Sequence, residues 1–338
     1  MFSTMRLGGK AAYLTHILSE DDLTETVAWA HKHKVPFIMI GGGANIIFSD
    51  KGFKGLIMVN EISGIDIKAN TVTIGAGEIW DEVVTKTLEA GLSGIESLSK
   101  IPGKTGAAPV QNIGAYGQEI AQVLKSVRAY DIEASKFVEL SNSDCHFDYR
   151  ASRFNRADKG RFLITQVTLS LHKAAPKPPY YRDVQSYIDE HHIIKVTPQI
   201  IREAVTAIRA YKLPDPSVVA NCGSFFYNPI IGKSQFEKLA LKYPAINHAP
   251  SGWAQPPRWF LDDGKVKISA AWLLQQAGFT DYEDLKTGLA LWPYQNLVVI
   301  NKKAKRTKDL QAFTGKIIST VDKTFGIKLQ QEPELIGA

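Results

Sequence analysis

The order of segments around the first glycine run most narrows the folds open to this chain. Gly41-Gly-Gly-Ala-Asn45 directly follows Phe37–Ile40, which is typical of a strand, and Ile46-Ile-Phe48 after it is also strand-like. A Rossmann-type dinucleotide fold needs G-x-G-x-x-G at the start of a helix, because the helix N-terminus faces the pyrophosphate. Neither that spacing nor a following helix is present, so this segment is not a Rossmann fingerprint.

Hydrophobic periodicity predicts helices and strands in similar measure along the rest of the chain. Ser19-Glu-Asp-Asp22 predicts a capped helix start, and residues 163–171 alternate as a half-buried strand does. Leu213-Pro-Asp-Pro216 predicts a linker between domains. Further strands are expected at 71–74, 126–131 and 297–300, and further helices at 79–90, 198–208, 269–276 and 310–326.

The net charge of +6 raises the question of nucleic-acid binding. Lysine and arginine are scattered, and only Lys302-Lys-Ala-Lys-Arg-Thr-Lys308 is a dense basic run. This run is typical of a solvated loop before a helix, so we expect no nucleic-acid partner. A mildly positive field also suits polyanionic small molecules such as dinucleotides and nucleotide sugars.

No segment of the sequence predicts a membrane or secretory role. The longest apolar runs, such as Phe37–Ile40, are strand-length, whereas a helix that spans a bilayer needs roughly 20 residues. The first six residues lack the features of a secretory signal. Cys145 and Cys222 have no CxxC spacing, which fits reduced structural thiols. We therefore expect a cytoplasmic protein.

A second glycine-rich stretch, residues 101–117, shows no clear periodicity. Backbone this permissive, beside Gln111 and Asn112, suits close approach to a flat polar ligand, and a long surface loop is the alternative. The adjacent histidines of Glu190-His-His192 would point apart on a helix or a strand. No metal site is expected there.

Short motifs occur in order along nearly the whole chain: Gly41-Gly-Gly-Ala-Asn45, Ile101-Pro-Gly103, Gly106-Ala-Ala-Pro109, Gln111-Asn-Ile-Gly-Ala-Tyr-Gly117, Asn221-Cys-Gly-Ser-Phe-Phe226, Asn228-Pro229 and Glu332-Pro-Glu334. In kind and in order, these motifs resemble those of the UDP-N-acetylenolpyruvoylglucosamine reductase family. Tyr180-Tyr181-Arg-Asp183 resembles the form of the family that has an extra tyrosine loop over the substrate.

The resemblance implies an α+β fold in two parts. A two-part FAD-binding domain of the vanillyl-alcohol-oxidase (PCMH) type, without a Rossmann helix, precedes a smaller α+β substrate-binding domain. The expected boundaries are 1–60 and 61–198 for the two FAD-binding subdomains, with the tyrosine loop near 176–195, 199–216 for a linker helix, 217–325 for the substrate-binding domain, and 326–338 for a C-terminal segment that returns to the active site.

The resemblance also implies an activity. With noncovalent FAD, and with NADPH as electron donor, the enzyme reduces UDP-N-acetylglucosamine enolpyruvate to UDP-N-acetylmuramate in peptidoglycan precursor synthesis. Flavin N5 delivers the hydride and Ser224 supplies the proton. A monomer without nucleic-acid or membrane partners is expected. The alternatives are a related FAD-linked oxidase and a non-catalytic module that binds a nucleotide sugar or flavin.

Three residues match the family's catalytic positions. Ser224 donates the proton, Arg150 grips the substrate carboxylate with its planar fork, and Glu334 polarises the other side of that carboxylate. Without the resemblance each residue has another interpretation. Ser224 would be a turn serine bonded to its own backbone, Arg150 would form an interdomain ion pair, and Glu334 would lie on a frayed C-terminus.

The remaining matched positions are implied to bind cofactor or substrate. The positions implied for FAD are Gly41, Gly43, Ala44 and Asn45 at the pyrophosphate, Ile101, Gly103, Ala107, Ala108, Gln111, Ile113 and Gly114 at the isoalloxazine and ribityl chain, and Arg209 facing the flavin phosphate. The positions implied for the substrate nucleotide are Tyr181, Lys212, Asn228, Lys267 and Gln295.

Two positions depart from the family pattern. A histidine commonly precedes the residue matched by Gln295, and here the preceding segment is Leu291-Trp-Pro-Tyr294. An arginine usually follows the second glutamate of the C-terminal motif by two residues, and here that position is Ile336. We therefore expect altered contacts near Trp292, and a contact at Ile336 that is lost or is supplied by another basic residue such as Arg209.

Overall fold

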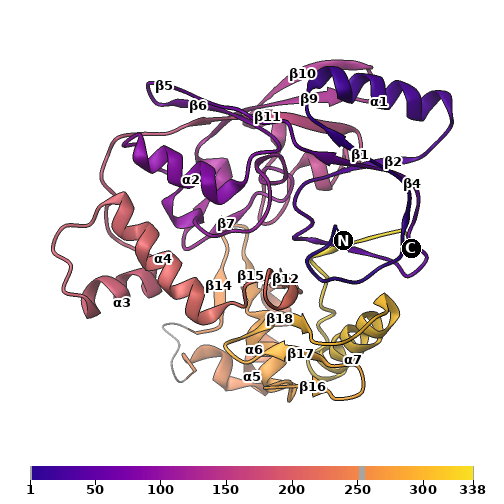
Figure 1. Cartoon of the computed structure of the whole chain (residues 1–338). Helices are drawn as coiled ribbons and strands as arrows, with labels where there is room; N and C mark the ends of the chain where they lie inside the picture. The colour runs from indigo at the N-terminus through magenta and orange to yellow at the C-terminus, as the bar shows by residue number, and fades with distance from the viewer. Residues whose placement is uncertain (1, 251–255, 338) are drawn as a thin grey trace. The chain divides into compact units, whose positions relative to one another are not determined.

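The structure is a computed structural model that describes residues 2–250 and 256–337, and these residues form two compact units (Figure 1). The N-terminal unit contains residues 11–43 and 53–210. The C-terminal unit contains residues 2–10, 44–52 and the described part of 211–337. The short segment after the first glycine run therefore belongs with the C-terminal half of the chain. No helix in the described ranges is long and apolar enough to cross a membrane.

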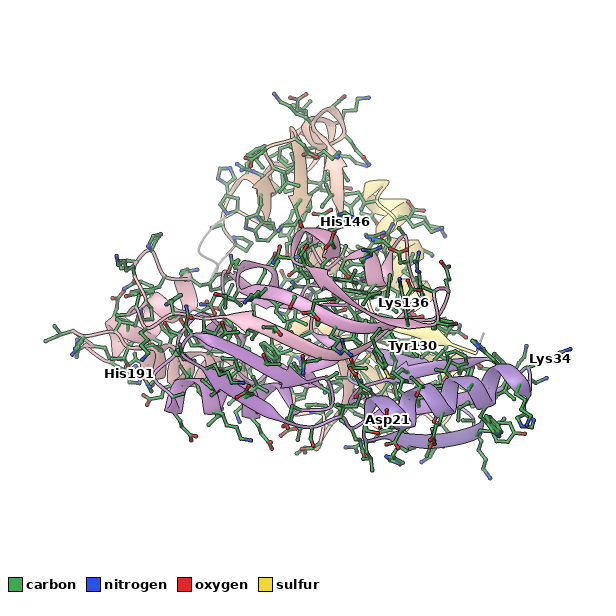
Figure 2. All side chains as sticks on the ribbon, turned by 90° about the horizontal axis from the view of Figure 1, so that it is seen from above. Asp21, Lys34, Tyr130, Lys136, His146 and His191 are labelled. Atoms are coloured by element: carbon green, nitrogen blue, oxygen red, sulfur yellow. The ribbon has the colours of Figure 1, made fainter. Side chains whose placement is uncertain are left out.

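A three-stranded parallel sheet begins the N-terminal unit, in the order β1 (Ala11–Ile17), β4 (Phe53–Asn60), β2 (Phe37–Ile40). Helix α1 (Glu20–Lys32) starts as predicted, because Ser19 Oγ accepts a hydrogen bond from Asp22 N at 3.0 Å. Its apolar face is buried with Leu56 and Met58 of the sheet. Figure 2 shows α1 lengthwise, with Asp21 in its first turn and Lys34 just past its end.

The second sheet of this unit is antiparallel, and helix α2 (Trp80–Glu89) packs on it through Val83 and Val84. The predicted strand at 163–171 is confirmed, since Leu163, Val167 and Leu169 are buried. The strand order is β10 (Lys136–Ser141), β9 (Leu124–Asp131), β11 (Phe162–Ser170), β6 (Thr71–Gly75), β5 (Ile65–Lys68).

Two helices complete the N-terminal unit, α3 (Arg182–Glu190) and α4 (Pro198–Lys212), and α4 ends at the boundary between the units. Val184 of α3 and Ile201 of α4 share one buried cluster. The shorter elements of this unit are β7 (Gly114–Ala115), β8 (Gln118–Glu119) and 3-10 turns at Glu96–Leu98, Thr105–Ala107, Ile120–Gln122, Ser143–Cys145 and Arg153–Asn155.

In its described residues, the C-terminal unit is built around two antiparallel sheets and three helices. Trp272 and Phe325 are buried in its core and lie 6.1 Å apart between ring centroids. One sheet has the order β12 (Ala220–Ser224), β18 (Gln295–Asn301), β17 (Leu289–Trp292), β16 (Glu283–Asp284), and the other has the order β13 (Ile230–Gly232), β15 (Lys265–Ile268), β14 (Arg258–Phe260). The helices are α5 (Lys233–Lys242), α6 (Ala270–Gln276) and α7 (Thr307–Phe325), with a 3-10 turn at Pro244–Asn247.

The chain end is tied to the glycine run by a parallel pair of strands. β3 (Ile46–Phe48) pairs with β19 (Glu334–Ile336), and Ser49 N donates to Ile336 O at 2.8 Å. The segment after the glycine run is therefore a strand, as the sequence predicts. The predicted subdomain boundaries remain a prediction, and their outermost residues, Met1 and Ala338, lie outside the described residues.

Candidate active site

The two glycine-rich segments of the N-terminal unit lie against each other. A Cβ added at Gly42 would be 3.2 Å from Gly103 Cα, and one added at Gly41 would be 3.3 Å from Lys104 Cβ. Gly103 has φ +126°, a conformation that L side chains rarely adopt. A side chain at Gly41 or Gly42 would fit only if the facing segment moved by a few tenths of an ångström, so backbone groups line this region.

The loop that carries Gly103 is fixed by backbone hydrogen bonds on both sides of it. Trp80 N donates to Gly103 O at 3.1 Å, Thr105 N donates to Glu78 O at 2.8 Å, and Gly106 N donates to Ala76 O at 2.8 Å. A Cβ at Gly106 would be 2.6 Å from Ala76 Cβ, so only glycine fits there. The predicted cofactor positions 101–108 are therefore held by hydrogen bonds to the segment between β6 and the start of α2.

A buried asparagine that the sequence did not single out for a role holds the next part of the glycine-rich stretch. Asn112 Nδ2 donates to Glu119 Oε2 at 2.8 Å and to Asp148 O at 3.1 Å, and its Oδ1 accepts from Ala121 N at 3.1 Å. These bonds place the predicted positions 111–114 beside the turn at 148–151. An amide with both ends occupied in this way fixes the backbone on either side.

Arg150 lies against the backbone of Gly114. Its Nη2 donates to Gly114 O at 2.5 Å, and a Cβ at Gly114 would be 2.8 Å from Arg150 Nη1. Arg150 itself has φ +51°, and Asn155 Nδ2 donates to its carbonyl at 3.2 Å. The structure therefore brings together the predicted carboxylate-binding residue and one predicted flavin-lining glycine.

Tyr116, Tyr181 and Arg209 form a polar and aromatic cluster in the same unit. The Tyr116 side chain is hydrogen-bonded to Arg209, and the Tyr181 ring meets the Tyr116 ring edge-on at 5.5 Å between centroids. Burial raises the pKa of Tyr116 to about 12, although the positive charge of Arg209 opposes this rise. Tyr116 is thus a neutral phenol at neutral pH. The sequence assigned it no role, although it lies within the motif at residues 111–117.

In the C-terminal unit, Ser224 ends β12 at an irregularity in the ladder with β18. Asn221 pairs with Ile300 and Ser224 pairs with Val298, so the intervening residues include an extra one. Gly223 takes φ +74° there, and its N–H donates to Asn221 Oδ1 at 3.0 Å. Ser224 is half-buried, and the part of the chain that the structure describes offers its Oγ no hydrogen-bond partner.

The segment that carries Glu334 runs beside the segment that carries Ser224. Phe226 and Gln331 form an antiparallel bridge, and Glu332 N donates to Phe225 O at 2.9 Å. Glu334 N donates to Asn45 O at 3.0 Å where β19 meets β3. The C-terminal unit therefore brings together the neighbourhoods of Ser224, Glu334 and Asn45, which are far apart in the sequence.

The predicted nucleotide-binding residues of this unit fall into two pairs. Asn228 and Lys267 are held close by the β13–β15 ladder, and Asn228 Oδ1 accepts from Ala270 N at 2.9 Å at the start of α6. Lys212 and Gln295 follow Tyr211 and Tyr294, whose rings lie 5.2 Å apart between centroids.

Trp292, at the position that departs from the family pattern, has a buried indole nitrogen. This Nε1 has no hydrogen-bond partner among the residues that the structure describes. Its ring lies 6.0 Å from that of Tyr294 between centroids, so the departure places an aromatic pair directly before Gln295.

The remaining reactive side chains are inert in this structure. Cys145 and Cys222 are buried free thiols; burial raises the pKa of Cys145 to about 12 and raises the pKa of Cys222 as well. Both thiols therefore stay protonated at neutral pH. Within residues 2–250 and 256–337, no group of three or more His, Cys, Asp or Glu side chains could hold a metal ion.

Comparison with known proteins gives matches along the whole chain. A family model described as FAD binding domain matches residues 11–141, and one described as UDP-N-acetylenolpyruvoylglucosamine reductase, C-terminal domain, matches residues 215–336. The UDP-N-acetylenolpyruvoylglucosamine reductase of Ralstonia nicotianae is 36% identical, covering 99% of this chain and 96% of that protein. The enzyme of the same name from Streptomyces coelicolor is 35% identical, covering 99% of this chain and 88% of that protein.

A solved structure is similar over the same extent. The crystal structure of UDP-N-acetylenolpyruvylglucosamine reductase from Thermus caldophilus matches with a TM-score of 0.65 and 19% identity, covering 99% of this chain and 96% of that one. This likeness concerns the fold, and it agrees with the α+β architecture of an FAD-binding part followed by a second domain.

Proposed function

Because the chain belongs to the UDP-N-acetylenolpyruvoylglucosamine reductase family, we propose a specific division of its reaction among its residues. The protein is an FAD-dependent oxidoreductase that reduces UDP-N-acetylglucosamine enolpyruvate in peptidoglycan precursor synthesis. The identity to relatives over 99% of the chain carries this conclusion.

The glycine-rich surface of the N-terminal unit fits FAD. Gly42 packs closely on Gly103, where an added Cβ would be 3.2 Å from Gly103 Cα, and a Cβ at Gly103 would meet no atom of the described chain within 4 Å. Such a surface lets a flat cofactor approach the backbone itself. Backbone N–H groups of Gly41, Gly43, Ala44 and Asn45 would hold the pyrophosphate. The ring and ribityl chain would contact Ile101, Gly103, Ala107, Ala108, Gln111, Ile113 and Gly114, with Arg209 at a phosphate.

The protein's own chemistry is to hold charge and supply a proton. Bound FAD would supply the hydride chemistry, from NADPH to the terminal carbon of the enolpyruvyl double bond. The substrate is then carbanionic at the carbon next to its carboxylate. Ser224 Oγ–H protonates that carbon, and its half-buried hydroxyl, free of partners in the described chain, supports this role.

Arg150 and Glu334 manage the charge that spreads onto the substrate carboxylate. The planar fork of Arg150 suits a bidentate contact with a carboxylate, and its left-handed backbone and its bond to Gly114 fix where the fork points. Glu334 acts from the other side and does so best when it shares a proton, since two bare carboxylates repel each other. Pairing of β19 with β3 holds Glu334 in place.

Two lysines and three polar side chains would hold the nucleotide of the substrate. Lys212 and Lys267 offer point charges to the diphosphate, while Asn228, Gln295 and Tyr181 offer polar contacts. The anchored amide of Asn228 and its neighbour Lys267 on the β13–β15 ladder support this assignment. We further propose that the enzyme works in the cytoplasm as a monomer, without nucleic-acid or membrane partners.

Anaerobic kinetics test the reaction. The purified protein should be yellow, and NADPH should reduce it. Sustained NADPH oxidation should require the UDP-enolpyruvyl sugar. Turnover with dioxygen as the only acceptor would point to the oxidase alternative, and a colourless protein that does not take up FAD would point to the non-catalytic one.

A further inference from the structure

A hollow of about 740 Å³ in the C-terminal unit is lined by none of the residues proposed to bind FAD or the sugar nucleotide. It lies among the turn after β16, the loop 303–306 and the first turns of α7, which Figure 1 draws in orange and yellow. The loop is the dense basic run of the sequence. The lining residues with charge are Asp284, Lys286, Lys303, Lys305, Arg306, Asp309 and Lys316.

Arg306 pairs with one of the two acids of the hollow, and neutral donors bind the other. Both oxygens of Asp309 accept from Arg306, at 2.9 and 3.2 Å. Asp284 accepts from the Thr287 hydroxyl at 2.7 Å and from Lys286 N at 3.0 Å. Five cations against two carboxylates give the lining a net charge of +3.

The four lysines come from three separate segments and converge on this one space. No ion pair of Lys286, Lys303 or Lys305 occurs within the described chain. Lys316 Nζ is bonded only to a neutral group there, the Tyr282 hydroxyl at 2.8 Å. Lysines that lie around one hollow repel one another, and an anion between them relieves that repulsion.

One of these lysines is held in position by packing. The stem of Lys303 crosses Gly288, where an added Cβ would be 2.6 Å from Lys303 Cγ, and Lys302 N donates to Gly288 O at 3.0 Å. One wall of the hollow is apolar, because the Tyr282 ring stacks on Phe313 at 5.3 Å. The hollow therefore combines positive charge with a flat wall.

We propose that this hollow is a second anion site, which binds a small molecule carrying two or more phosphate groups. Ammonium groups bind phosphate as point charges, and a volume of this size is typical of small-molecule sites. The arrangement of the charges on a turn, a loop and a helix around one hollow favours a compact ligand over an extended acidic chain. The ligand class is that of inorganic polyphosphates and nucleoside polyphosphates.

Calorimetry with inorganic triphosphate tests the proposal. The FAD-loaded enzyme is first saturated with UDP-N-acetylmuramate, so that the proposed substrate site is filled. One equivalent of triphosphate should then bind at low ionic strength, and binding should weaken as salt is added. A parallel titration with ADP tells a phosphate-chain site from a nucleotide site by which ligand binds more tightly.

A matched pair of charge-reversal variants locates the binding. Lys303→Glu with Lys305→Glu should weaken binding at least about tenfold, whereas Lys308→Glu with Lys328→Glu, equal in charge but outside the lining, should change it less than about twofold. Lys286→Glu, on another segment, should also weaken it. Both double variants should keep the flavin spectrum and turnover. No binding by either probe, or equal weakening in the two pairs, would overturn the site.

Discussion

Ser224 stands directly before Phe225 and Phe226, which are both fully buried, so its neighbours fix its position while its own side chain stays half-exposed. The irregular ladder at Gly223 shifts the register just before this residue, which pairs with Val298. The proposed proton donor therefore depends on packing on one side of it and on a glycine on the other. Packing and backbone conformation together thus fix where the hydroxyl of Ser224, a weak acid, would donate its proton.

Ser224→Ala should separate the two halves of the reaction. Reduction of the flavin by NADPH should stay at the wild-type rate, while reduction of the enolpyruvyl sugar should slow by about 10²- to 10⁴-fold, the usual contribution of a general acid. Stopped-flow spectroscopy of each half-reaction measures this. Ser224→Cys, which keeps an ionisable proton, should recover part of the rate. Turnover of Ser224→Ala at the wild-type rate would show that another group supplies the proton.

The two glycine loops act at the scale of elements, because each is shaped by the other and by the strands beneath. Lys104 Nζ reaches Asn60 O at 2.6 Å, which ties the second loop to β4 close to where the parallel sheet ends. The proposed FAD-binding surface around Gly42 and Gly103 is thus attached to both sheets of the N-terminal unit. A single methyl group added to one of these loops should therefore weaken FAD binding.

Gly42→Ala should weaken FAD binding by about tenfold, because its Cβ would lie 3.2 Å from Gly103 Cα and would push the two loops apart. Titration of the apoprotein with FAD, followed by quenching of flavin fluorescence, measures the change. Gly315→Ala is the control, since a Cβ there meets no described atom within 4 Å and alanine suits a helix interior. Equal affinity in the Gly42 variant would place FAD elsewhere.

Helices α2 and α4 are joined by a partly buried carboxylate. Asp81 accepts from Arg202 at 2.7 and 3.0 Å and from Lys100 N at 2.7 Å. Burial opposes ionisation of Asp81, but these hydrogen bonds outweigh it and hold the pKa of Asp81 well below its usual value of 3.8. Because the folded pKa is the lower one, the resulting stability is present above pH 3.8 and is lost as the pH falls further.

Asp81→Asn should therefore lower the free energy of unfolding at neutral pH by about 2–3 kcal/mol. Two cations lose their partner, Arg202 and the Lys100 ammonium, whose Nζ lies 2.9 Å from Asp81 Oδ2. The difference from wild type should shrink as the pH falls below about 4. Urea unfolding at a series of pH values measures both effects. Asp263→Asn is the control, since Asp263 is exposed and pairs only within its own turn. A difference that grows at acid pH would contradict the assignment.

At the scale of the whole molecule, three segments that are far apart in the sequence pack together in the C-terminal unit. Residues 2–10, 44–52 and 334–336 come together there, with Thr307 Oγ1 donating to Phe48 O at 2.6 Å. The N-terminus joins them, since Ser3 Oγ donates to Ile46 O at 2.6 Å. The position of Glu334 thus depends on segments that lie far apart in the sequence.

Deleting residues 334–338 should lower the thermal midpoint by about 5 °C or more, because β3 loses its partner and Leu335 leaves the core. Glu334→Gln keeps β19 and should leave the midpoint unchanged while slowing turnover. Thermal melting followed by circular dichroism, together with steady-state kinetics, separates the two effects. An unchanged midpoint in the truncated protein would show that the strand pair contributes little.

Much of the candidate site follows from local chemistry in the sequence. The glycine run between two strands excludes a Rossmann helix, and the capped start of α1 and the alternation of β11 are visible in the residues themselves. These features are set by backbone sterics and periodicity over a few residues. The ordered motifs identify the family for the same reason, since each motif is short and contiguous.

The partners of the site residues depend on contacts between segments far apart in the sequence. The residues did not predict that β3 pairs with β19, that Asn112 joins Glu119 to Asp148, or that Tyr116 bonds Arg209. The basic run looks like a solvated loop in the sequence and becomes one side of a lined hollow only when α7 and β16 lie beside it. The sequence by itself determined which chemical groups are present and their local conformation. Tertiary structure alone decided which of them meet, because packing and long-range hydrogen bonds select those contacts.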